Sequence, residues 1–440
     1  MIKTSSKIAA VMTLLSGVAF LISDSGNQVE AQTAPRFKFD PDWPKPLPNK
    51  WKLGGVTGLA VDKDDNIWVL NRPNDLVSIE VHAEQEPPLA DCCAHAPAMI
   101  HFDKAGNVIG SFDAPQGHGM AVDKQGFIYI GQNTVRKYDP KTGKMLAAIP
   151  HIPETANGQP FDDNPRIGWV KGQGSAGPVA GFITVGDGAR GGRGGRGGRG
   201  GDGAATQAQL QQTAFVAKYP PTTPMIVGGI EEIRTDDAVN EIYVADNSFG
   251  GRVMVFSLDK FEFKRGWGAY GHKLSEISTK PEDHAYTPNG PMAKEFVGHL
   301  TFNFSTDGLV YAADRSGNRI HVTDKQGNFK QEFKLAEWTG VGGAAGGVMF
   351  SNDKDQKVLY ISDLTNNHVW FLDRKTGTVL GTLGQMGESG GSFFGLHMEA
   401  TDSKGNLYTG EVFAGQRVQR FVPADSPRGK LLDQLSRVQP

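Results

Sequence analysis

Short apolar runs, each a few residues long and followed by a turn, recur along this chain. Runs such as residues 128–130 and 253–256 are typical of half-buried β-strands. No segment shows a sustained helical period with capping residues, and the 57 glycines suit a chain that is dense in turns. The pattern therefore predicts an all-β fold.

One unit occurs six times: a glycine-rich start, a short apolar strand, a turn with Asp, Asn or Gly, and further β-rich strands. The copies begin near Gly55, Gly117, Val227, Val297, Gly343 and Phe394. Such a unit cannot bury both faces of its sheet alone, so six copies predict a six-bladed β-propeller. We expect residues 37–47 (FKFDPDWPKPL) to add a strand to the last blade and close the ring, which removes an exposed edge.

The two ends of the chain lie outside the repeats. Two lysines and an apolar run ending at Ile22 precede a cleavage-like sequence at residues 29–31, which is typical of a secretory signal peptide. An uncleaved N-terminal anchor is the alternative. We therefore expect an extracytoplasmic protein, periplasmic or secreted, with a signal peptide at 1–31, a propeller at 32–425 and a tail at 426–440.

Composition narrows the possible partners. The formal net charge is −3, and it stays the same without residues 1–31, which carry two lysines and two acidic residues. A nearly neutral chain gives no general reason to bind nucleic acid or a membrane surface. No segment after the signal peptide is long and apolar enough to cross a membrane. We expect a monomer.

Residues 152–224 interrupt the repeats between the second and third copies. Within them, residues 190–201 read RGGRGGRGGRGG. Such tracts can bind RNA, but an extracytoplasmic protein meets little RNA. We interpret this region as a disordered surface insertion between blades two and three.

The only two cysteines, Cys92 and Cys93, are adjacent, which excludes a framework of several disulfides. In an oxidising compartment they could form a vicinal disulfide that clamps a loop, or they could remain free thiols. A redox element is the alternative, although the chain offers no other thiol for exchange.

Three histidines occupy the same position in alternate repeats. His118, His299 and His397 each stand at the start of a first strand in blades two, four and six. Alternate blades of a six-bladed ring differ by about 120°, and first strands line the channel. The corresponding positions of the other blades are occupied by residues at or next to Thr57, Ile230 and Gly346. The three imidazoles are therefore expected to converge on the channel axis.

Three converging imidazoles with an open position predict a metal site. Zn²⁺ suits such a site and can activate a bound oxygen, although Cu, Fe and Ni also bind histidine. The alternative is that each histidine caps a strand or binds a channel water. The other eight histidines fit no ligand position and are expected mostly on the surface or in loops.

These motifs resemble a known family. The chain is similar to NHL-repeat propellers and, among them, to peptidylamidoglycolate lyase (the peptidyl-α-hydroxyglycine α-amidating lyase domain) and its bacterial relatives. The resemblance implies that GHGMAVD, VGHLTFN and GLHMEAT carry zinc ligands and that Arg72 in NIWVLNRPND is catalytic. Arg72 would hold the substrate carboxylate while an α-hydroxyglycine C–N bond is cleaved to an amide and glyoxylate.

The chain departs from this family at two positions. Ser248 and Phe249 stand where the family has its catalytic tyrosine, and Tyr270 is only nearby in sequence. Met398, followed by Glu399, replaces an aspartate that binds calcium in the family. The catalytic base is therefore not assigned, and a calcium site is not carried over.

Three functions remain open at this point. The first is an extracytoplasmic metal-dependent carbon–nitrogen lyase. The second is a non-catalytic propeller that binds a protein, peptide or glycan, which the missing tyrosine and aspartate favour. The third is a hydrolase or oxidoreductase that holds a different metal on the same histidines.

Overall fold

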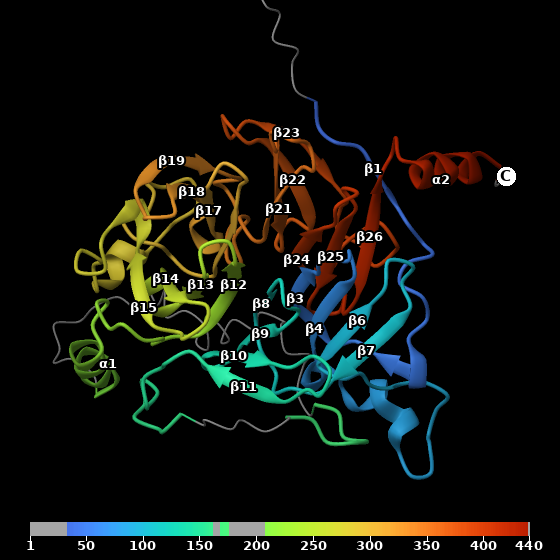
Figure 1. Cartoon of the computed structure of the whole chain (residues 1–440), viewed down its shortest axis with the longest axis horizontal. Coiled ribbons are helices and arrows are strands. Elements are labelled where there is room, and N and C mark those ends of the chain that lie inside the picture. Colours follow the sequence, from blue (N-terminus) through green and yellow to red (C-terminus); the bar gives the residue numbers. More distant parts are fainter. Residues whose placement is uncertain (1–32, 162–167, 176–206, 439–440) are drawn as a thin grey trace, which may run out of the picture. The chain divides into compact units, whose positions relative to one another are not determined.

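Six four-stranded antiparallel sheets make up the fold, and each follows one of the six repeats (Figure 1). Consecutive strands are neighbours within the sheets of blades 1 to 5, which the chain completes one after another, whereas blade 6 takes its outermost strand from the start of the chain. The six-bladed β-propeller predicted from the repeats is confirmed.

The strands of each blade, from the channel outward, are as follows. Blade 1 comprises β3 (Gly55–Val61), β4 (Ile67–Arg72), β6 (Met99–Phe102) and β7 (Val108–Phe112), and blade 2 comprises β8 (Met120–Val122), β9 (Ile128–Gly131), β10 (Val135–Tyr138) and β11 (Met145–Ala148). Blade 3 comprises β12 (Ile230–Asp236), β13 (Glu241–Asp246), β14 (Arg252–Ser257) and β15 (Phe263–Trp267), and blade 4 comprises β16 (Leu300–Phe304), β17 (Leu309–Asp314), β18 (Arg319–Asp324) and β19 (Phe329–Lys334). Blade 5 comprises β20 (Val348–Phe350), β21 (Val358–Asp363), β22 (His368–Asp373) and β23 (Val379–Leu383), and blade 6 comprises β24 (Leu396–Thr401), β25 (Leu407–Glu411), β26 (Val418–Pro423) and β1 (Phe37–Phe39).

The structure describes residues 33–161, 168–175 and 207–438. The predicted signal peptide at 1–31 and the Gly/Arg tract at 190–201 lie outside these residues. Within the described ranges, no helix has the length and apolar content of a membrane span.

The first strands of the six blades contact one another in the order β3, β8, β12, β16, β20 and β24, and β24 contacts β3 again. They therefore line a central channel, and the middle strands behind them are buried on both faces. Hydrophobic clusters fill the space between neighbouring blades, for example between blades 2 and 3 and between blades 4 and 5. Because each sheet packs against two others, strands such as β13 and β21 are buried at every position.

β1 closes the ring, as expected for the segment that begins at Phe37. It pairs antiparallel with β26, with Phe37 opposite Pro423 and Phe39 opposite Phe421. Only residues 37–39 of the expected 37–47 form the strand. Asp40 follows directly and is fully buried between the guanidinium groups of Arg420 and Arg428.

A buried acidic residue ends the second strand of several blades and organises the turn around it. In blade 3, Asp246 accepts the backbone N–H groups of Val227 and Gly228 and forms an ion pair with Arg252. The same pairing occurs between Asp314 and Arg319 in blade 4 and between Glu411 and Arg417 in blade 6. This motif fixes the start of the first strand, where the histidines of the channel stand.

The described residues also contain two α-helices, which the sequence analysis did not predict. Helix α1 (Gln207–Lys218) lies in the expected insertion, and α2 (Pro427–Val438) lies in the expected C-terminal tail. Helix α2 does carry a start signal: Ser426 accepts the N–H of Gly429 through its hydroxyl, and Pro427 occupies the first helical position. The inference that no segment shows a sustained helical period with capping residues was therefore wrong for the C-terminal tail.

The remaining elements are short. Strand β2 (Trp51–Lys52) pairs parallel with β5 (Ala94–His95), and Cys92 and Cys93 are joined by a disulfide bond directly before β5. The 3₁₀ helices are η1 (Pro48–Lys50), η2 (Pro73–Asp75), η3 (Ser78–Glu84), η5 (Ser248–Gly250), η6 (Ala269–Gly271), η7 (Pro281–His284) and η8 (Arg315–Gly317).

Candidate functional site

The three histidines at equivalent repeat positions come together at one mouth of the channel. His118 Nε2 lies 2.7 Å from His397 Nε2 and 3.5 Å from a carboxylate oxygen of Glu231. His299 Nδ1 lies 3.2 Å from the other oxygen of the same carboxylate. Glu231 therefore joins His118 and His299 into one cluster, which we call the histidine mouth.

Glu231 could not be predicted from the repeat pattern, because a β-bulge places it at the mouth. The pairing of β12 with β13 shifts between Ile230 and Glu232, which leaves Glu231 as the extra residue of the bulge. His397 is the extra residue of a matching bulge in β24. Regular alternation would point neighbouring side chains to opposite faces, so the bulges are needed to turn these two side chains toward the mouth.

Asn247 holds this arrangement from the neighbouring turn. Its amide oxygen accepts the backbone N–H of His299 at 3.0 Å, and its amide nitrogen donates to Glu231. His299 has a backbone φ of 57°, in the left-handed region that non-glycine residues rarely adopt. The hydrogen bond to Asn247 therefore holds a strained residue in the position from which its ring reaches Glu231.

Two arginines border the histidine mouth. Arg315, in η8, is 9% exposed, and its Nη1 lies 3.5 Å from Nδ1 of His397. Arg72 ends β4 and forms an ion pair with the buried carboxylate of Asp75, with an Nη2–Oδ2 distance of 2.8 Å. Both positive charges act on the histidines, and they make the mouth suitable for an anionic group.

Burial and these charges set the protonation states. Burial lowers the pKa of His118 and lowers that of His397 further, and the charge of Arg72 adds to both shifts. Burial alone would raise the pKa of Glu231, but the neighbouring His118, His299 and Arg315 bring it well below its usual range. His118 and His397 are therefore neutral at pH 7, beside an ionised Glu231.

The ring nitrogens have defined partners. His118 Nδ1 donates to the backbone carbonyl oxygen of Glu231 at 2.9 Å, which leaves Nε2 as an acceptor. Nδ1 of His397 faces the Arg315 donor, so its Nε2 carries the proton and donates to His118. The pair thus has a complete hydrogen-bond pattern.

The side chains at the histidine mouth are of the types that bind metal ions, but the distance between two of their nitrogen atoms is too short for one metal ion. Neutral imidazoles are the usual ligands of Zn²⁺, and a second ring nitrogen bonded to a carbonyl is typical of a metal-binding histidine. Two imidazole ligands of one tetrahedral zinc lie roughly 3.3 Å apart, so His118 and His397, at 2.7 Å, would have to separate by about 0.6 Å. Within the described residues, no three His, Cys, Asp or Glu side chains stand in an arrangement that could hold a metal as it is.

The positions where the chain departs from the lyase family offer no phenol to the mouth. Ser248, in η5, has a buried hydroxyl without a hydrogen-bond partner. Met398 is buried in the core, and both carboxylate oxygens of Glu399 are buried without a hydrogen-bond partner.

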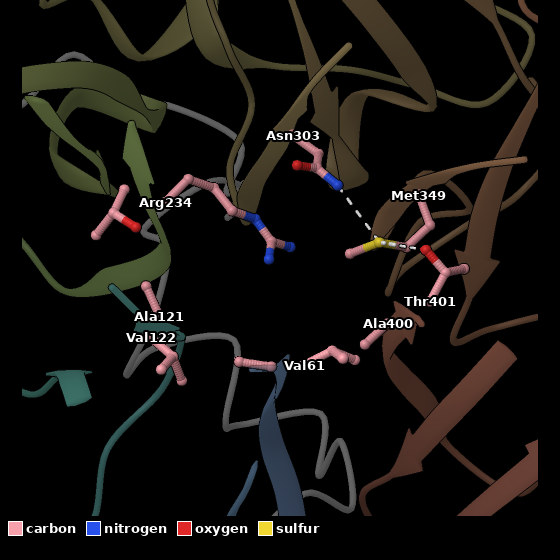
Figure 2. A pocket seen from close by; sticks show the side chains of 10 residues that line it. Val61, Ala121, Val122, Arg234, Asn303, Met349, Ala400 and Thr401 are labelled. Carbon is pink, nitrogen blue, oxygen red and sulfur yellow. Dashed lines mark hydrogen bonds between the residues drawn. The ribbon is translucent and has the colours of Figure 1, made fainter. Parts of the chain in front are cut away.

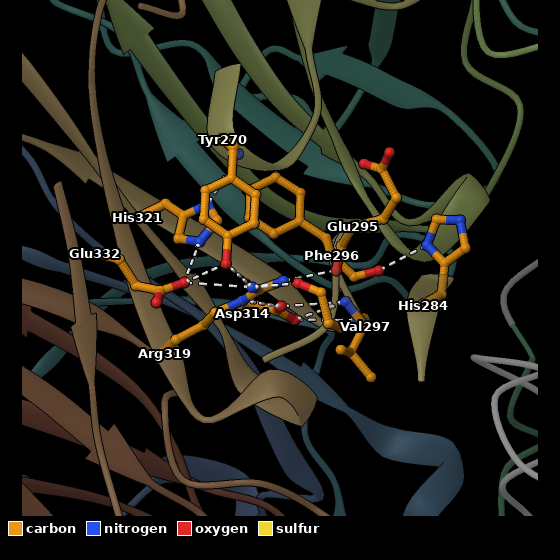
Figure 3. A network of polar contacts seen from close by, with 11 residues as sticks. Tyr270, His284, Glu295, Phe296, Val297, Asp314, Arg319, His321 and Glu332 are labelled. Carbon is orange, nitrogen blue, oxygen red and sulfur yellow. Dashed lines mark hydrogen bonds and ion pairs between the residues drawn. The ribbon is translucent and has the colours of Figure 1, made fainter. Parts of the chain in front are cut away.

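Tyr270 lies away from the channel, in a network on the outer strands of blade 4 (Figure 3). Its hydroxyl donates to Glu332 on β19 at 2.8 Å and accepts from Arg319 on β18 at 2.8 Å. His321 is fully buried beside it, with Nε2 2.9 Å from Glu332. Tyr270 therefore joins the loop after blade 3 to blade 4.

Two of the other eight histidines are exceptions to the expectation that most lie on the surface or in loops. His95 and His321 are buried, and both lie in strands. His95 is paired with Glu84 and stacked on Trp169. Both histidines therefore have structural partners: His321 within blade 4, and His95 in the segment between β4 and β6 of blade 1.

The network around Glu332 predicts an acid-dependent loss of stability. Burial alone would raise the pKa of Glu332, but hydrogen bonds from His321 and Tyr270 and the charge of Arg319 lower it from 4.5 to about 2. A lowered carboxyl pKa stabilises the fold above pH 4.5, and this contribution is lost as the pH falls from 4.5 to 2. We expect Glu332→Gln to cost about 2 kcal/mol at pH 7 and to flatten the unfolding free energy between pH 5 and 3.

Urea unfolding at several pH values measures this difference. Glu337→Gln, on a partly exposed Glu that pairs with Lys334, is the matched control and should leave the pH dependence unchanged. Parallel pH profiles of Glu332→Gln and the unmodified protein would contradict the assignment.

Comparisons with known proteins identify no family for this chain. No family model matches the chain, and no curated protein sequence matches it. Among solved structures, a protein of unknown function from Bacteroides thetaiotaomicron is 12% identical, with 84% of this chain and 70% of that chain covered and a TM-score of 0.46. Virginiamycin B lyase from Staphylococcus aureus is 10% identical, with 84% and 86% covered and a TM-score of 0.41. The β-propeller domain of Cps50 (Swd1) from Myceliophteria thermophila is 9% identical, with 83% of each chain covered and a TM-score of 0.43.

Proposed function

We propose that the histidine mouth is the active site of a lyase that acts on a small carboxylated substrate. The observation that carries this proposal is a neutral imidazole pair, His118 and His397, enclosed by two arginines and an ionised glutamate. Neutral histidines can take up and return a proton near pH 7, and guanidinium groups hold a carboxylate in two-point hydrogen bonds. The resemblance of the histidine motifs and Arg72 to peptidylamidoglycolate lyase supports the same reaction class.

The residues of the mouth can carry both proton transfers of an α-hydroxyglycine cleavage. Arg315 and Arg72 hold the substrate carboxylate. His118 Nε2 takes the hydroxyl proton, the C–N bond breaks as the aldehyde carbonyl forms, and the protonated His118 returns this proton to the leaving amide nitrogen. The products are an amide and glyoxylate, and the proton count is unchanged. Glu231 stabilises the charged form of His118 between the two transfers.

A transition metal, Zn²⁺ first, is the alternative occupant of the mouth. It would be held by His118, His299 and His397, would lower the pKa of the substrate hydroxyl, and would replace His118 Nε2 as the group that acts on that hydroxyl. His397 is neutral, so binding through Nε2 would move its ring proton to Nδ1 without net proton release. Metal content is a readout that is independent of turnover.

The test combines metal analysis with turnover of an α-hydroxyglycine peptide by purified protein. We expect about one equivalent of metal in the unmodified protein, lost in His118→Ala, His299→Ala and His397→Ala, and turnover reduced by about 100-fold or more. His82→Ala removes a histidine from η3, outside the channel, and should change neither. The absence of turnover in the unmodified protein with any supplied metal would reject the lyase proposal.

The absence of a tyrosine at Ser248 favours a second candidate, a non-catalytic propeller that binds a protein, peptide or glycan. Ligand binding that survives the double change His118→Ala plus His299→Ala, without turnover, would assign this function instead.

A further inference from the structure

The opposite mouth of the channel contains a separate pocket of about 270 Å³ (Figure 2). Residues from the later parts of all six first strands line it, whereas the histidines stand where first strands begin. On β24, His397 and Thr401 are four residues apart, so the two sites are separated by about 13 Å of strand.

Arg234 on β12 is the only charged residue of this lining, and its side chain reaches into the middle of the pocket (Figure 2). Its Nε donates to the backbone carbonyl oxygen of Phe302 at 3.2 Å, and its Nη2 donates to Glu232 at 3.2 Å. The side chain is 17% exposed. Among the described residues, none accepts a hydrogen bond from Nη1, so the guanidinium is fixed on one side and has a free donor toward the pocket.

The other residues that line the pocket place apolar side chains on one side and polar side chains on the other. Blades 1 and 2 contribute only apolar side chains, including Val61 and Val122. Blades 3, 4 and 6 contribute the polar Thr235, Asn303 and Thr401. The volume lies just below the usual range for ligand pockets, so only a small molecule fits. A fitting ligand therefore has one anionic head near Arg234 and a compact apolar body.

We propose that this pocket, the arginine mouth, binds a small organic monocarboxylate through Arg234, with the apolar body against the ends of β3 and β8. Fixed guanidinium groups suit planar carboxylates because two parallel N–H groups match the two oxygens. Glu232 competes for the same guanidinium from inside the channel. The proposal does not depend on the lyase activity of the histidine mouth.

The test is calorimetric titration of the full chain with benzoate, and with benzamide as the neutral probe of the same shape. We expect saturable benzoate binding, at least 10-fold weaker or absent benzamide binding, and at least a 10-fold loss of benzoate affinity in Arg234→Gln. Glu232→Gln removes the internal competitor and should strengthen binding several-fold. This gain is the opposite of what a fold defect would produce.

Two further measurements locate the site. Val122→Tyr should block the pocket without changing its charge, and His118→Ala should bind benzoate as the unmodified protein does. Equal binding of benzoate and benzamide, unchanged benzoate binding in Arg234→Gln, or loss of binding only in His118→Ala would overturn the proposal. Inorganic phosphate binding as tightly as benzoate would overturn the requirement for an apolar body.

Discussion

A chain that starts at Asp40, and so lacks β1, is expected to lose about 5 kcal/mol of unfolding free energy relative to one that starts at residue 32. β1 supplies the outer strand of blade 6, so its removal exposes the hydrogen-bonding edge of β26. It also removes Phe37 from Tyr360 and Phe371, at ring-centroid distances of 6.0 and 5.9 Å. Complete burial of a Phe is worth about 3–5 kcal/mol, and these rings are partly buried.

Urea unfolding and size-exclusion chromatography measure this effect. The double change Phe37→Ala plus Phe39→Ala keeps the strand backbone and should lose about half as much. Lys38→Ala, which removes only the partly exposed pair with Asp433, should change stability by about 0.5 kcal/mol or less. A shortened chain that is equally stable and does not self-associate would show that β1 does not close the ring.

Arg252→Met is expected to destabilise the fold by about 3–5 kcal/mol, because it leaves a buried charge without its partner. Arg252 is fully buried and forms an ion pair with Asp246 at 2.8 Å. It also donates to the backbone carbonyl oxygens of Thr223 and Met225, at 3.0 and 2.7 Å. Methionine fills a similar volume but offers no hydrogen-bond donor, so these acceptors stay buried and unpaired.

The midpoint of urea denaturation checks this value. The control is Arg437→Ala. The side chain of Arg437 is 77% exposed, so its ion pair with Asp433 should contribute about 0.5 kcal/mol or less. Adding Asp246→Leu to Arg252→Met should recover part of the loss, because it removes the unpaired charge. A cost for Arg252→Met no larger than that of the exposed pair would reject the role assigned to the buried motif.

The fold was predictable because the repeats combine three local signals. These signals are short apolar runs, polar turns and the constant order in which the two alternate. Each signal depends only on residues that are close in sequence, so it can be recognised without the tertiary structure. The helix in the tail was missed because its evidence is a single capping serine with a proline, Ser426 and Pro427, rather than an apolar stripe. Helix α1 has little amphipathic pattern, and its existence depends on context that the sequence does not show.

The histidine mouth was predictable only in part. His118, His299 and His397 stand at one repeat position, so aligning the repeats brings them together. Glu231 was missed because its side chain reaches the mouth through a bulge, which strand alternation does not predict.

Arg315 had a signal that the sequence analysis did not use. Asn71, Asp246 and Asp314 all bind the backbone N–H groups that precede their first strand. The residues that follow them are Arg72, Asn247 and Arg315. Aligning the ends of the second strands would have placed all three at the same mouth.

The closure of blade 6 also determines when the propeller can be completed during synthesis of the chain. Phe37 pairs with Pro423, so β1 leaves the ribosome 386 residues before its partner (423 − 37 = 386). At roughly 5–20 residues per second, β1 waits about 20–80 s before it can pair. β1 has only three residues, with a lysine in the middle. Such a strand pairs poorly with incorrect strands before β26 has been made. Because His397 belongs to the same late blade, the histidine mouth stays incomplete until residue 397 has been made.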